Sequence, residues 1–173
     1  MQLFVERIKT PIGPLLITHD GQALANIAFA DHEERRAGEL ARDFPCGQVK
    51  RAPKPTQFAA ALTHYFEGEI RAIDKLPVID FGTHFQKLCW NALRRVPPGT
   101  TRTYGDHARA IGRPAAPRAV GAANGKNPIP IVVPCHRVIG KDGSLTGFGG
   151  GLDKKRWLLE HERRVAAGAA IAD

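Results

Sequence analysis

The sequence predicts a mixed α/β (α+β) fold in two parts: a small N-terminal α/β domain over residues 1–80 and a mostly helical C-terminal domain over residues 81–173. Apolar runs that meet at a turn dominate the first part, and capped helices with amphipathic spacing follow one another in the second. The 173 residues are 43% hydrophobic, so the chain can bury a sizeable core.

A β-hairpin is predicted near the N-terminus, where two apolar runs flank Asp20-Gly21. An Asp-Gly pair favours the tight turn of a hairpin because both central residues take positive φ. Asp31 then precedes Glu34 by three residues, which is the spacing of a capping box. We therefore expect a polar helix to begin there and to end before Pro45.

The rest of the first part is predicted to hold a loop over residues 47–55, a second helix and a short strand-like run over residues 76–79. Thr56 opens the helix and Gly68 closes it. One face of this helix is apolar, which indicates that it is buried. The residues of that face are Phe58, Ala61, Leu62, Tyr65 and Phe66.

The second part begins with a helix that Thr83 and Gln86 cap reciprocally and that a Pro-Pro-Gly run from residue 97 stops. The apolar residues of this helix recur at positions i, i+3, i+4 and i+7. Cys89 belongs to that stripe and is therefore predicted to be a core residue.

Two further short helices form a predicted helix-turn-helix of winged-helix-like type. Thr103 and Asp106 cap the first, which ends near Gly112, and the second runs from Pro117 to about Asn124. The second helix consists mainly of small residues, so its backbone can approach another surface closely. It offers few of the large polar side chains that read base edges, so sequence-specific recognition is not expected.

Prolines shape the segment after the helix-turn-helix, and residues 127–133 are predicted to be apolar and extended. A glycine run over residues 147–151 follows. Asp153 is predicted to cap a last helix, and the Ala-rich tail over residues 165–173 is predicted to fray. The apolar stripe of the last helix is Trp157, Leu158, His161 and Val165.

Charge is distributed unevenly along the chain. Lys and Arg number 25 against 17 Asp and Glu, which gives a net charge of +8 and an isoelectric point near 9.8. Residues 1–80 hold 10 basic and 11 acidic side chains, whereas residues 81–173 hold 15 and 6. The excess of positive charge favours a polyanionic partner, above all nucleic acid, and places its binding surface in the second part.

The three cysteines are too few for a disulfide framework and lack the spacing of a zinc site. A reducing cytoplasm suits such a chain. The first residues lack the apolar core of a signal peptide, and no apolar stretch has the length of a membrane span. We therefore expect a soluble, cytoplasmic protein that binds no metal.

Cys135 is the candidate nucleophile, because it follows a Pro-ended apolar run and precedes His136 and Arg137, two groups that favour a thiolate. The spacing alone leaves open a second interpretation, in which Cys135 is a small buried core residue. Neighbours on a strand point to opposite faces, so Cys135 and His136 can cooperate only if the backbone turns there. Glu162 lies at the edge of the last apolar stripe, where a carboxylate needs a partner.

The run Pro134-Cys135-His136-Arg137-Val138 resembles the active-site signature of the methylated-DNA-protein-cysteine methyltransferases, also called O6-alkylguanine-DNA alkyltransferases. The resemblance extends from about Phe85 to Glu162. It includes a second motif, Arg118-Ala119-Val120-Gly121. The N-terminal third resembles the variable α/β domain of that family more loosely.

This resemblance implies direct, irreversible transfer of a methyl or other alkyl group from the O6 atom of guanine in DNA to Cys135, once per molecule and without a cofactor. Whether O4-alkylthymine is also repaired stays open. The implied partner is double-stranded DNA that contains alkylated guanine, with no membrane contact, and the implied protein is a monomer. The helix-turn-helix would bind the minor groove and the damaged nucleotide would be flipped out of the duplex.

The resemblance also implies five catalytic residues. Cys135 would accept the alkyl group, His136 would take the proton of Cys135 through a water, and Glu162 would orient the imidazole. Tyr104 matches the family's tyrosine that donates toward a ring nitrogen of the departing guanine. Asn127 matches the asparagine that braces the turn holding the cysteine.

The resemblance also implies one set of residues that bind DNA and another that contact the substrate base. Arg118 matches the arginine that fills the space left by the flipped nucleotide, and Ala119, Gly121 and Asn124 accompany it on the small helix. The pocket for the flipped base would be lined by Val133, Phe148, Gly149, Gly150 and Lys155. Phe148 replaces a common tyrosine and Gly149 a frequent serine, which is expected to widen the range of alkyl groups accepted.

Two other classes of function compete with this hypothesis. A non-enzymatic module that marks alkylated guanine for another pathway would lack the acceptor cysteine, which is present here. A Cys-His hydrolase unrelated to DNA would turn over repeatedly on an ester or a peptide, and it would leave the basic second part of the chain unexplained.

Overall fold

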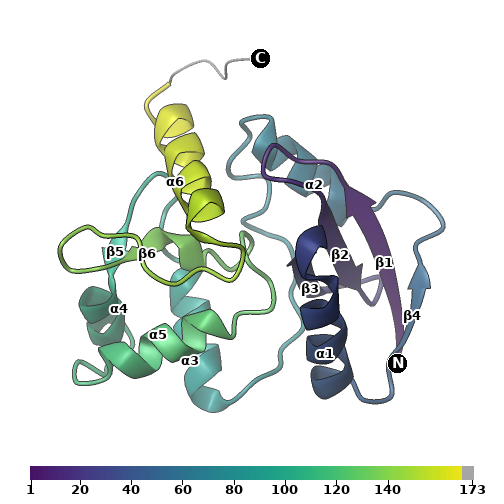
Figure 1. Ribbon diagram of the computed structural model, residues 1–173, viewed down its shortest axis with the longest axis horizontal. Helices are drawn as coiled ribbons and strands as arrows, with labels where there is room; N and C mark the ends of the chain where they lie inside the picture. The colour runs from purple at the N-terminus through teal and green to yellow at the C-terminus, as the bar shows by residue number, and fades with distance from the viewer. Residues whose placement is uncertain (169–173) are drawn as a thin grey trace. The chain divides into compact units, whose positions relative to one another are not determined.

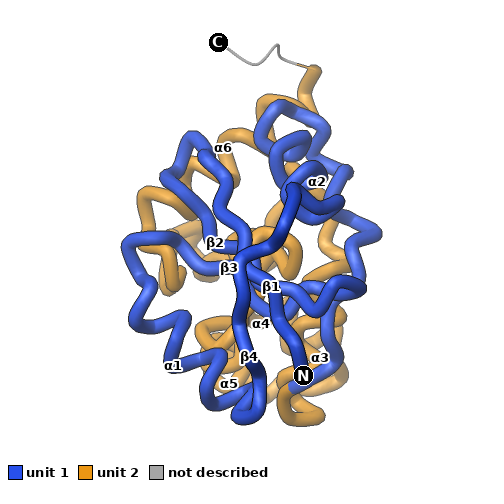
Figure 2. The backbone as a smooth tube through the Cα atoms, turned by 90° about the vertical axis from the view of Figure 1, so that its right-hand side faces the viewer, with its two compact units in different colours: residues 1–81 blue, residues 82–173 orange. Residues whose placement is uncertain are grey.

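A computed structural model describes residues 1–168 of the chain, which divides into two compact units, Met1–Phe81 and Gly82–Asp173 (Figure 2). The first unit combines a four-stranded sheet with helices, and the second is mostly helical with a two-stranded sheet. The predicted mixed α/β class is therefore confirmed. Within residues 1–168, no helix has both the length and the apolar character that a membrane span requires.

Three antiparallel strands and one parallel strand form the sheet of the first unit, in the order β3-β2-β1-β4 (Figure 1). The strands are β1 (Gln2–Ile8), β2 (Leu15–His19), β3 (Leu24–Phe29) and β4 (Gln48–Arg51). At the turn between β2 and β3, the Asp20 carboxylate accepts hydrogen bonds from the backbone N–H groups of Gln22 and Ala23, each at 2.8 Å. The predicted hairpin is confirmed.

The prediction of a loop over residues 47–55 is wrong for residues 48–51, which form β4. All four residues of β4 are exposed, so the strand lacks the alternation of buried and exposed side chains that reveals strands in a sequence. Its backbone holds it instead, because Gln48 N donates to the Met1 carbonyl (3.1 Å) and Ala52 N donates to the Val5 carbonyl (2.8 Å). β4 is an edge strand of the sheet.

The first helix, α1 (Glu33–Asp43), begins differently from the prediction. A 3₁₀ turn over residues 30–32 precedes it and makes His32 the N-cap, which forms no side-chain bond to the helix. The predicted capping box at Asp31 is therefore wrong, because the 3₁₀ turn places Asp31 outside the cap position.

The second helix, α2 (Gln57–Phe66), begins as predicted at Thr56, whose hydroxyl accepts a hydrogen bond from Phe58 N (3.2 Å). Its buried side chains include Leu62 and Tyr65, so the apolar face packs inward as expected. The strand-like run over residues 76–79 is shorter than predicted, because only Val78 forms a bridge, with Leu24 of β3.

Three helices and a two-stranded parallel sheet build the first part of the second unit (Figure 1). They are α3 (His84–Leu93), β5 (Arg102–Thr103), α4 (Tyr104–Ala110), α5 (Pro117–Gly125) and β6 (Val138–Ile139). The predicted helix caps at Thr83 and Thr103 are confirmed. α3, α4 and α5 share a core that contains Cys89, Ala108 and Val120, so Cys89 is the core residue that the spacing predicted.

The segment between α5 and the catalytic candidate is folded back on itself and is not extended over residues 127–133. Pro130 and Val133 form a bridge, and Ile131 takes a φ of +76°. Prolines exclude a helix but are compatible with turns, and this is why the prediction of an extended run was wrong.

The last helix, α6 (Leu152–Ala166), has Gly151 as its N-cap, without a side-chain bond. Asp153 lies in the first turn and not at the cap, so its predicted role is wrong. The buried face of α6 contains Leu158 and His161 of the predicted stripe, but also two charged residues, Lys155 and Glu162. The tail over residues 165–173 was predicted to fray, but α6 continues through Ala166. Residues 169–173 of that tail lie outside the described residues.

Replacing Thr83 with Ala tests how much the cap of α3 contributes to stability. The Thr83 hydroxyl accepts from Gln86 N (3.2 Å), and the Gln86 side chain accepts from Thr83 N (2.8 Å). We expect the variant to lose about 1 kcal/mol of unfolding free energy in urea denaturation. Thr101 is exposed and lies outside any helix, so Thr101→Ala should change stability by less than about 0.5 kcal/mol. Equal effects of the two changes would contradict the role of the cap.

Candidate functional site

Cys135 opens a 3₁₀ turn over Cys135–Arg137, at the end of the folded-back segment. Cys135 N donates to the Val133 carbonyl (2.8 Å), and Arg137 N donates to the Pro134 carbonyl (3.1 Å). The backbone therefore turns at the place where cooperation between Cys135 and His136 requires it. Cys135 retains 9% exposure, whereas His136 is fully buried. Cys135 is thus the least buried of the three residues of this turn.

The carboxylate of Glu162, on α6, collects four hydrogen bonds. His136 Nε2 lies 2.9 Å from Oε1, and the guanidinium of Arg137 donates to both oxygens, from Nη2 to Oε1 (2.8 Å) and from Nε to Oε2 (2.9 Å). Gly99 N donates to Oε2 (3.2 Å). Every donor is directed at a charge that is fully buried, so the carboxylate is paired and hydrogen-bonded as burial of a charge requires.

These contacts fix the charges of the buried groups. Burial alone would raise the pKa of Glu162, but His136 and Arg137 outweigh it and lower this pKa far below its usual range. Burial lowers the pKa of His136, and the Arg137 charge acts in the same direction, against the attraction of Glu162. At neutral pH the cluster therefore pairs an ionised Glu162 with a permanently charged Arg137, and His136 is a neutral imidazole.

The tautomer of His136 follows from this arrangement. A neutral imidazole carries one N–H, and the carboxylate of Glu162 accepts only, so Nε2 bears the hydrogen. Nδ1 then presents a lone pair. This atom is buried and has no hydrogen-bond partner among the residues that the structure describes. His136 is therefore arranged to accept a proton at Nδ1.

Asn127 braces the segment that leads to Cys135. Its Nδ2 donates to the Val133 carbonyl (2.7 Å), and its Oδ1 accepts from Ile129 N (3.0 Å). Both atoms of the amide are used, and the side chain is buried. The chain on both sides of the turn is thus tied to one side chain, in agreement with the general behaviour of Asn at turns.

Tyr104 and Lys155 meet at one backbone carbonyl, that of Thr146. The Tyr104 hydroxyl donates to it (3.0 Å), and the fully buried Lys155 Nζ donates to it (2.8 Å) and to the Val138 carbonyl (2.6 Å). Burial lowers the pKa of Lys155, while the charge of nearby Cys135 acts to raise it. Parallel pairing of β5 with β6 brings the start of α4 beside the end of the Cys135–Arg137 turn.

The exposed surface of α5 carries Arg118 and Ala119 but not Asn124, which is buried. Gly121 is partly buried because the Tyr104 ring packs against it, 3.7 Å from the position a Cβ would take. The residues predicted to bind DNA therefore differ in accessibility. Arg118 and Ala119 are accessible, whereas Gly121 lies beneath the Tyr104 ring and Asn124 is buried.

The residues predicted to line a base pocket also differ in solvent exposure. Val133 and Gly150 are buried, Phe148 is half-buried, and Gly149 is exposed. Gly151 N donates to the Phe148 carbonyl (2.9 Å), so the glycine run forms an ordered turn that leads into α6. Among the described residues, no group of three or more His, Cys, Asp or Glu side chains has an arrangement suited to a metal ion.

The sequence predicted none of the contacts that Arg137, Gly99 and Thr146 make in this site. Arg137 carried a usable signal, because a buried cation beside a Cys-His pair requires an anion elsewhere in the chain. It also donates from Nη1 to the Val96 carbonyl (2.6 Å), which ties the turn to the segment after α3. Gly99 and Thr146 use backbone atoms, which leave no signature in a sequence.

Comparison with known proteins gives matches along nearly the whole chain. The family model of the 6-O-methylguanine DNA methyltransferase ribonuclease-like domain matches residues 3–79, and that of the DNA-binding domain matches residues 84–164. The methylated-DNA-protein-cysteine methyltransferases of Shigella flexneri and Salmonella typhimurium are 44% and 45% identical to this chain over 165 residues. Each alignment covers 94% of this chain and 96% of the relative.

Solved structures are similar over the same extent. The crystal structure of Mycobacterium tuberculosis OGT in complex with DNA gives a TM-score of 0.77 at 37% identity, covering 95% of this chain and 94% of that one. The crystal structure of the O6-methylguanine methyltransferase of the same organism gives a TM-score of 0.78 at 39% identity, covering 99% of this chain and 96% of that one.

Replacing Glu162 with Gln tests the buried cluster. The amide keeps the shape but removes the charge and turns one acceptor into a donor that faces other donors. We expect a loss of about 3–5 kcal/mol of unfolding free energy in urea denaturation. Glu160 lies on the same helix, is 47% exposed and pairs with Arg163, so Glu160→Gln should cost at most about 1 kcal/mol. Similar losses in both variants would show that the cluster does not stabilise the fold.

Proposed function

The chain belongs to the methylated-DNA-protein-cysteine methyltransferase family, and on that premise we propose that Cys135 is the residue that receives the alkyl group. The protein repairs DNA by direct transfer of a methyl or other alkyl group from O6-alkylguanine to one of its own cysteines. The transfer is stoichiometric, because the thioether that forms has no route back to a thiol. Each molecule therefore acts once.

The observation that supports Cys135 most directly is the state of its neighbour. His136 is neutral, holds its Nε2 hydrogen on Glu162 and offers Nδ1 as an unpaired acceptor inside the protein. In the proposed mechanism Nδ1 takes the Cys135 proton through an intervening water, and Glu162 stabilises the imidazolium that forms. Arg137 keeps Glu162 ionised throughout this step.

Alkyl transfer then follows as a displacement at a saturated carbon. Sγ of Cys135 forms a bond to the alkyl carbon, the bond from that carbon to O6 breaks, and its electron pair passes to the guanine. The negative charge that develops on guanine must be neutralised for it to leave. The Tyr104 hydroxyl is proposed to donate toward a ring nitrogen of the base for this purpose.

Tyr104 must exchange a partner to do so. In the structure its hydroxyl donates to the Thr146 carbonyl, an interaction that the base would replace. The exchange leaves no carbonyl unpaired, because Lys155 continues to donate to the same oxygen. The cost of releasing Tyr104 is therefore small compared with that of exposing a buried unpaired acceptor.

Recognition of damaged DNA is assigned to the helix-turn-helix formed by α4 and α5. The exposed Arg118 and the small Ala119 suit close approach to the minor groove. We propose that the nucleotide is flipped out and that Arg118 occupies its place, at an unstacking cost of a few kcal/mol that is smallest for a badly paired lesion. The flipped base would then lie against Val133, Phe148, Gly149, Gly150 and Lys155.

A cytoplasmic location is part of the same proposal, because the substrate is DNA and none of Cys46, Cys89 and Cys135 forms a disulfide. All the proposed site residues come from a single chain, so a monomer suffices for the reaction.

The decisive experiment on the acceptor is intact-mass measurement after mixing the protein with a duplex that contains one O6-methylguanine. We expect a gain of one methylene mass that saturates at one per molecule and that is absent from Cys135→Ser. Cys46→Ser, which removes an exposed thiol, should gain the same mass as the wild type. A mass gain in Cys135→Ser would overturn the assignment. Tighter binding to the lesion duplex without any mass gain would favour the non-enzymatic alternative.

Replacing Arg118 with Ala tests nucleotide flipping. The variant should repair the lesion in duplex DNA at least about tenfold more slowly, because only the duplex requires extrusion, yet react normally with free O6-methylguanine. Rates measured at saturating DNA separate this effect from affinity. Arg113 is exposed on the turn between α4 and α5, so Arg113→Ala should weaken duplex binding without changing the saturated rate. Equal losses on both substrates would exclude the proposed role of Arg118.

A further inference from the structure

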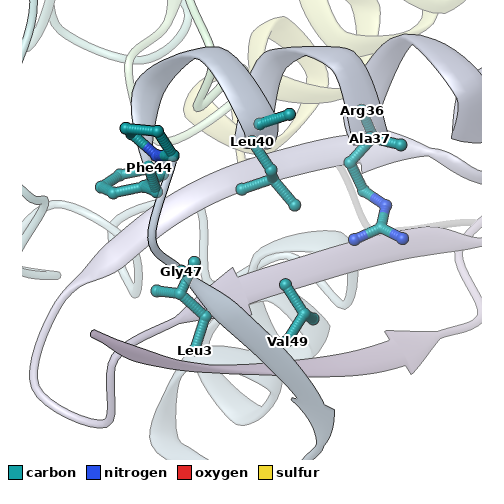
Figure 3. A pocket seen from close by; sticks show the side chains of 9 residues that line it. Leu3, Arg36, Ala37, Leu40, Phe44, Gly47 and Val49 are labelled. Carbon is teal, nitrogen blue, oxygen red and sulfur yellow. The ribbon is translucent and has the colours of Figure 1, made fainter.

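A groove in the first unit lies between α1 and the outer strand β4, and the alkyl-transfer mechanism makes no use of it (Figure 3). Its volume is about 280 Å³, just below the roughly 300–1,000 Å³ of pockets for drug-sized ligands, and suits one large side chain. The walls are mostly apolar. They include Leu3, Leu40, Phe44 and Val49.

Arg36 reaches from α1 into this groove, above the sheet (Figure 3). Only 11% of its side chain is exposed, and its Nε is buried without a hydrogen-bond partner among the described residues. The carboxylate that Arg36 does contact belongs to Glu33, which is 68% exposed and 3.5 Å from Nη2. A guanidinium among apolar walls favours a paired carboxylate, and here part of its donor set is unused.

β4 supplies a second element of a binding surface. Gln48 N and Ala52 N donate toward β1, so the alternation along a strand turns the polar backbone groups of Val49 and Arg51 toward the free edge. Val49 is 42% exposed and Met1, paired to the same strand, is 54% exposed. An exposed apolar edge beside unpaired backbone groups is typical of a site that accepts an added strand.

We propose that this groove binds the carboxyl-terminal segment of a partner protein. The segment adds to β4 as an extended strand. Its last side chain is apolar and enters the groove, and its terminal carboxylate pairs with Arg36. Backbone hydrogen bonds then supply affinity, and the groove and Arg36 select for an apolar residue with a free carboxylate.

Charge complementarity favours this occupant over nucleic acid. The groove offers one nearly buried cation, which matches a single carboxylate. α1, which forms one wall, carries four acidic residues and three arginines, and each arginine pairs with one of those carboxylates: Arg35 with Glu39, Arg36 with Glu33 and Arg42 with Asp43. β4 adds two exposed cations, Lys50 and Arg51. The phosphates of a polyanion such as DNA would need a longer row of unpaired cations than this.

The test uses the full chain and fluorescently labelled pentapeptides that end in Phe, Leu or Val, each prepared as the free carboxylate and as the carboxyamide. Fluorescence anisotropy should detect binding of at least one free-carboxylate peptide, with at least tenfold weaker binding of its amide. Arg36→Gln should weaken binding at least tenfold. Arg35→Gln is the matched control, because Arg35 is 46% exposed and pairs with Glu39 outside the groove (2.9 Å), and it should bind as the wild type does.

Two further measurements make the outcome decisive. Amide NMR signals of Val49 and Arg51 should shift on titration with the peptide, as strand addition requires. Val49→Glu changes an exposed side chain, so it should fold normally and still weaken binding, which covers the case in which Arg36→Gln is destabilised.

Several results would overturn the proposal. One is the absence of carboxylate-dependent binding up to millimolar peptide, and another is unchanged peptide binding by Arg36→Gln. A third is displacement of the peptide by duplex DNA. The fourth is a concentration-dependent dimer that Arg36→Gln abolishes. The last would assign the groove to a second copy of the chain. Arg36 takes no part in alkyl transfer, so Arg36→Gln should repair O6-methylguanine normally. A failure here therefore leaves the proposed function intact.

Discussion

The hydrogen bonds to the buried Glu162 carboxylate are the interactions on which the second unit depends. It is fully inaccessible to solvent, and it remains ionised because Arg137, His136 and Gly99 satisfy both of its oxygens. Those donors come from the turn over Cys135–Arg137 and from the segment after α3, while the carboxylate belongs to α6. One charge thus joins three parts of the unit.

The same carboxylate influences the protonation state of His136, the proposed base. Arg137 is charged at any relevant pH and compensates Glu162, so His136 is free to remain neutral in a buried position. A neutral imidazole with its hydrogen on Nε2 is a base at Nδ1, whereas a protonated one would have no basic nitrogen. The structural ion pair and the proposed catalytic base therefore belong to one arrangement of hydrogen bonds.

Local patterns predicted much of the fold, because a hairpin turn or a capping box lies within a few residues of sequence. Asp20-Gly21 and Thr83 with Gln86 are such cases. The caps at Asp31 and Asp153 failed because a 3₁₀ turn and Gly151 took the cap positions, and β4 was missed because none of its side chains is buried. Cys135 was a candidate nucleophile from its sequence neighbours alone, whereas the roles of the other site residues rested on the family resemblance. Gly99 and Thr146 make their contacts through backbone atoms, which every residue type has, so the sequence could not predict them.

Ile131 adds a mechanical aspect to this architecture. A β-branched residue at a φ of +76° costs of order 1–3 kcal/mol, and Ile131 is held there in full burial between the two backbone groups that Asn127 binds. The two Asn127 hydrogen bonds therefore restrain a strained loop. Ile131 lies four residues before Cys135, so loss of those bonds would let the loop relax and would displace the proposed nucleophile.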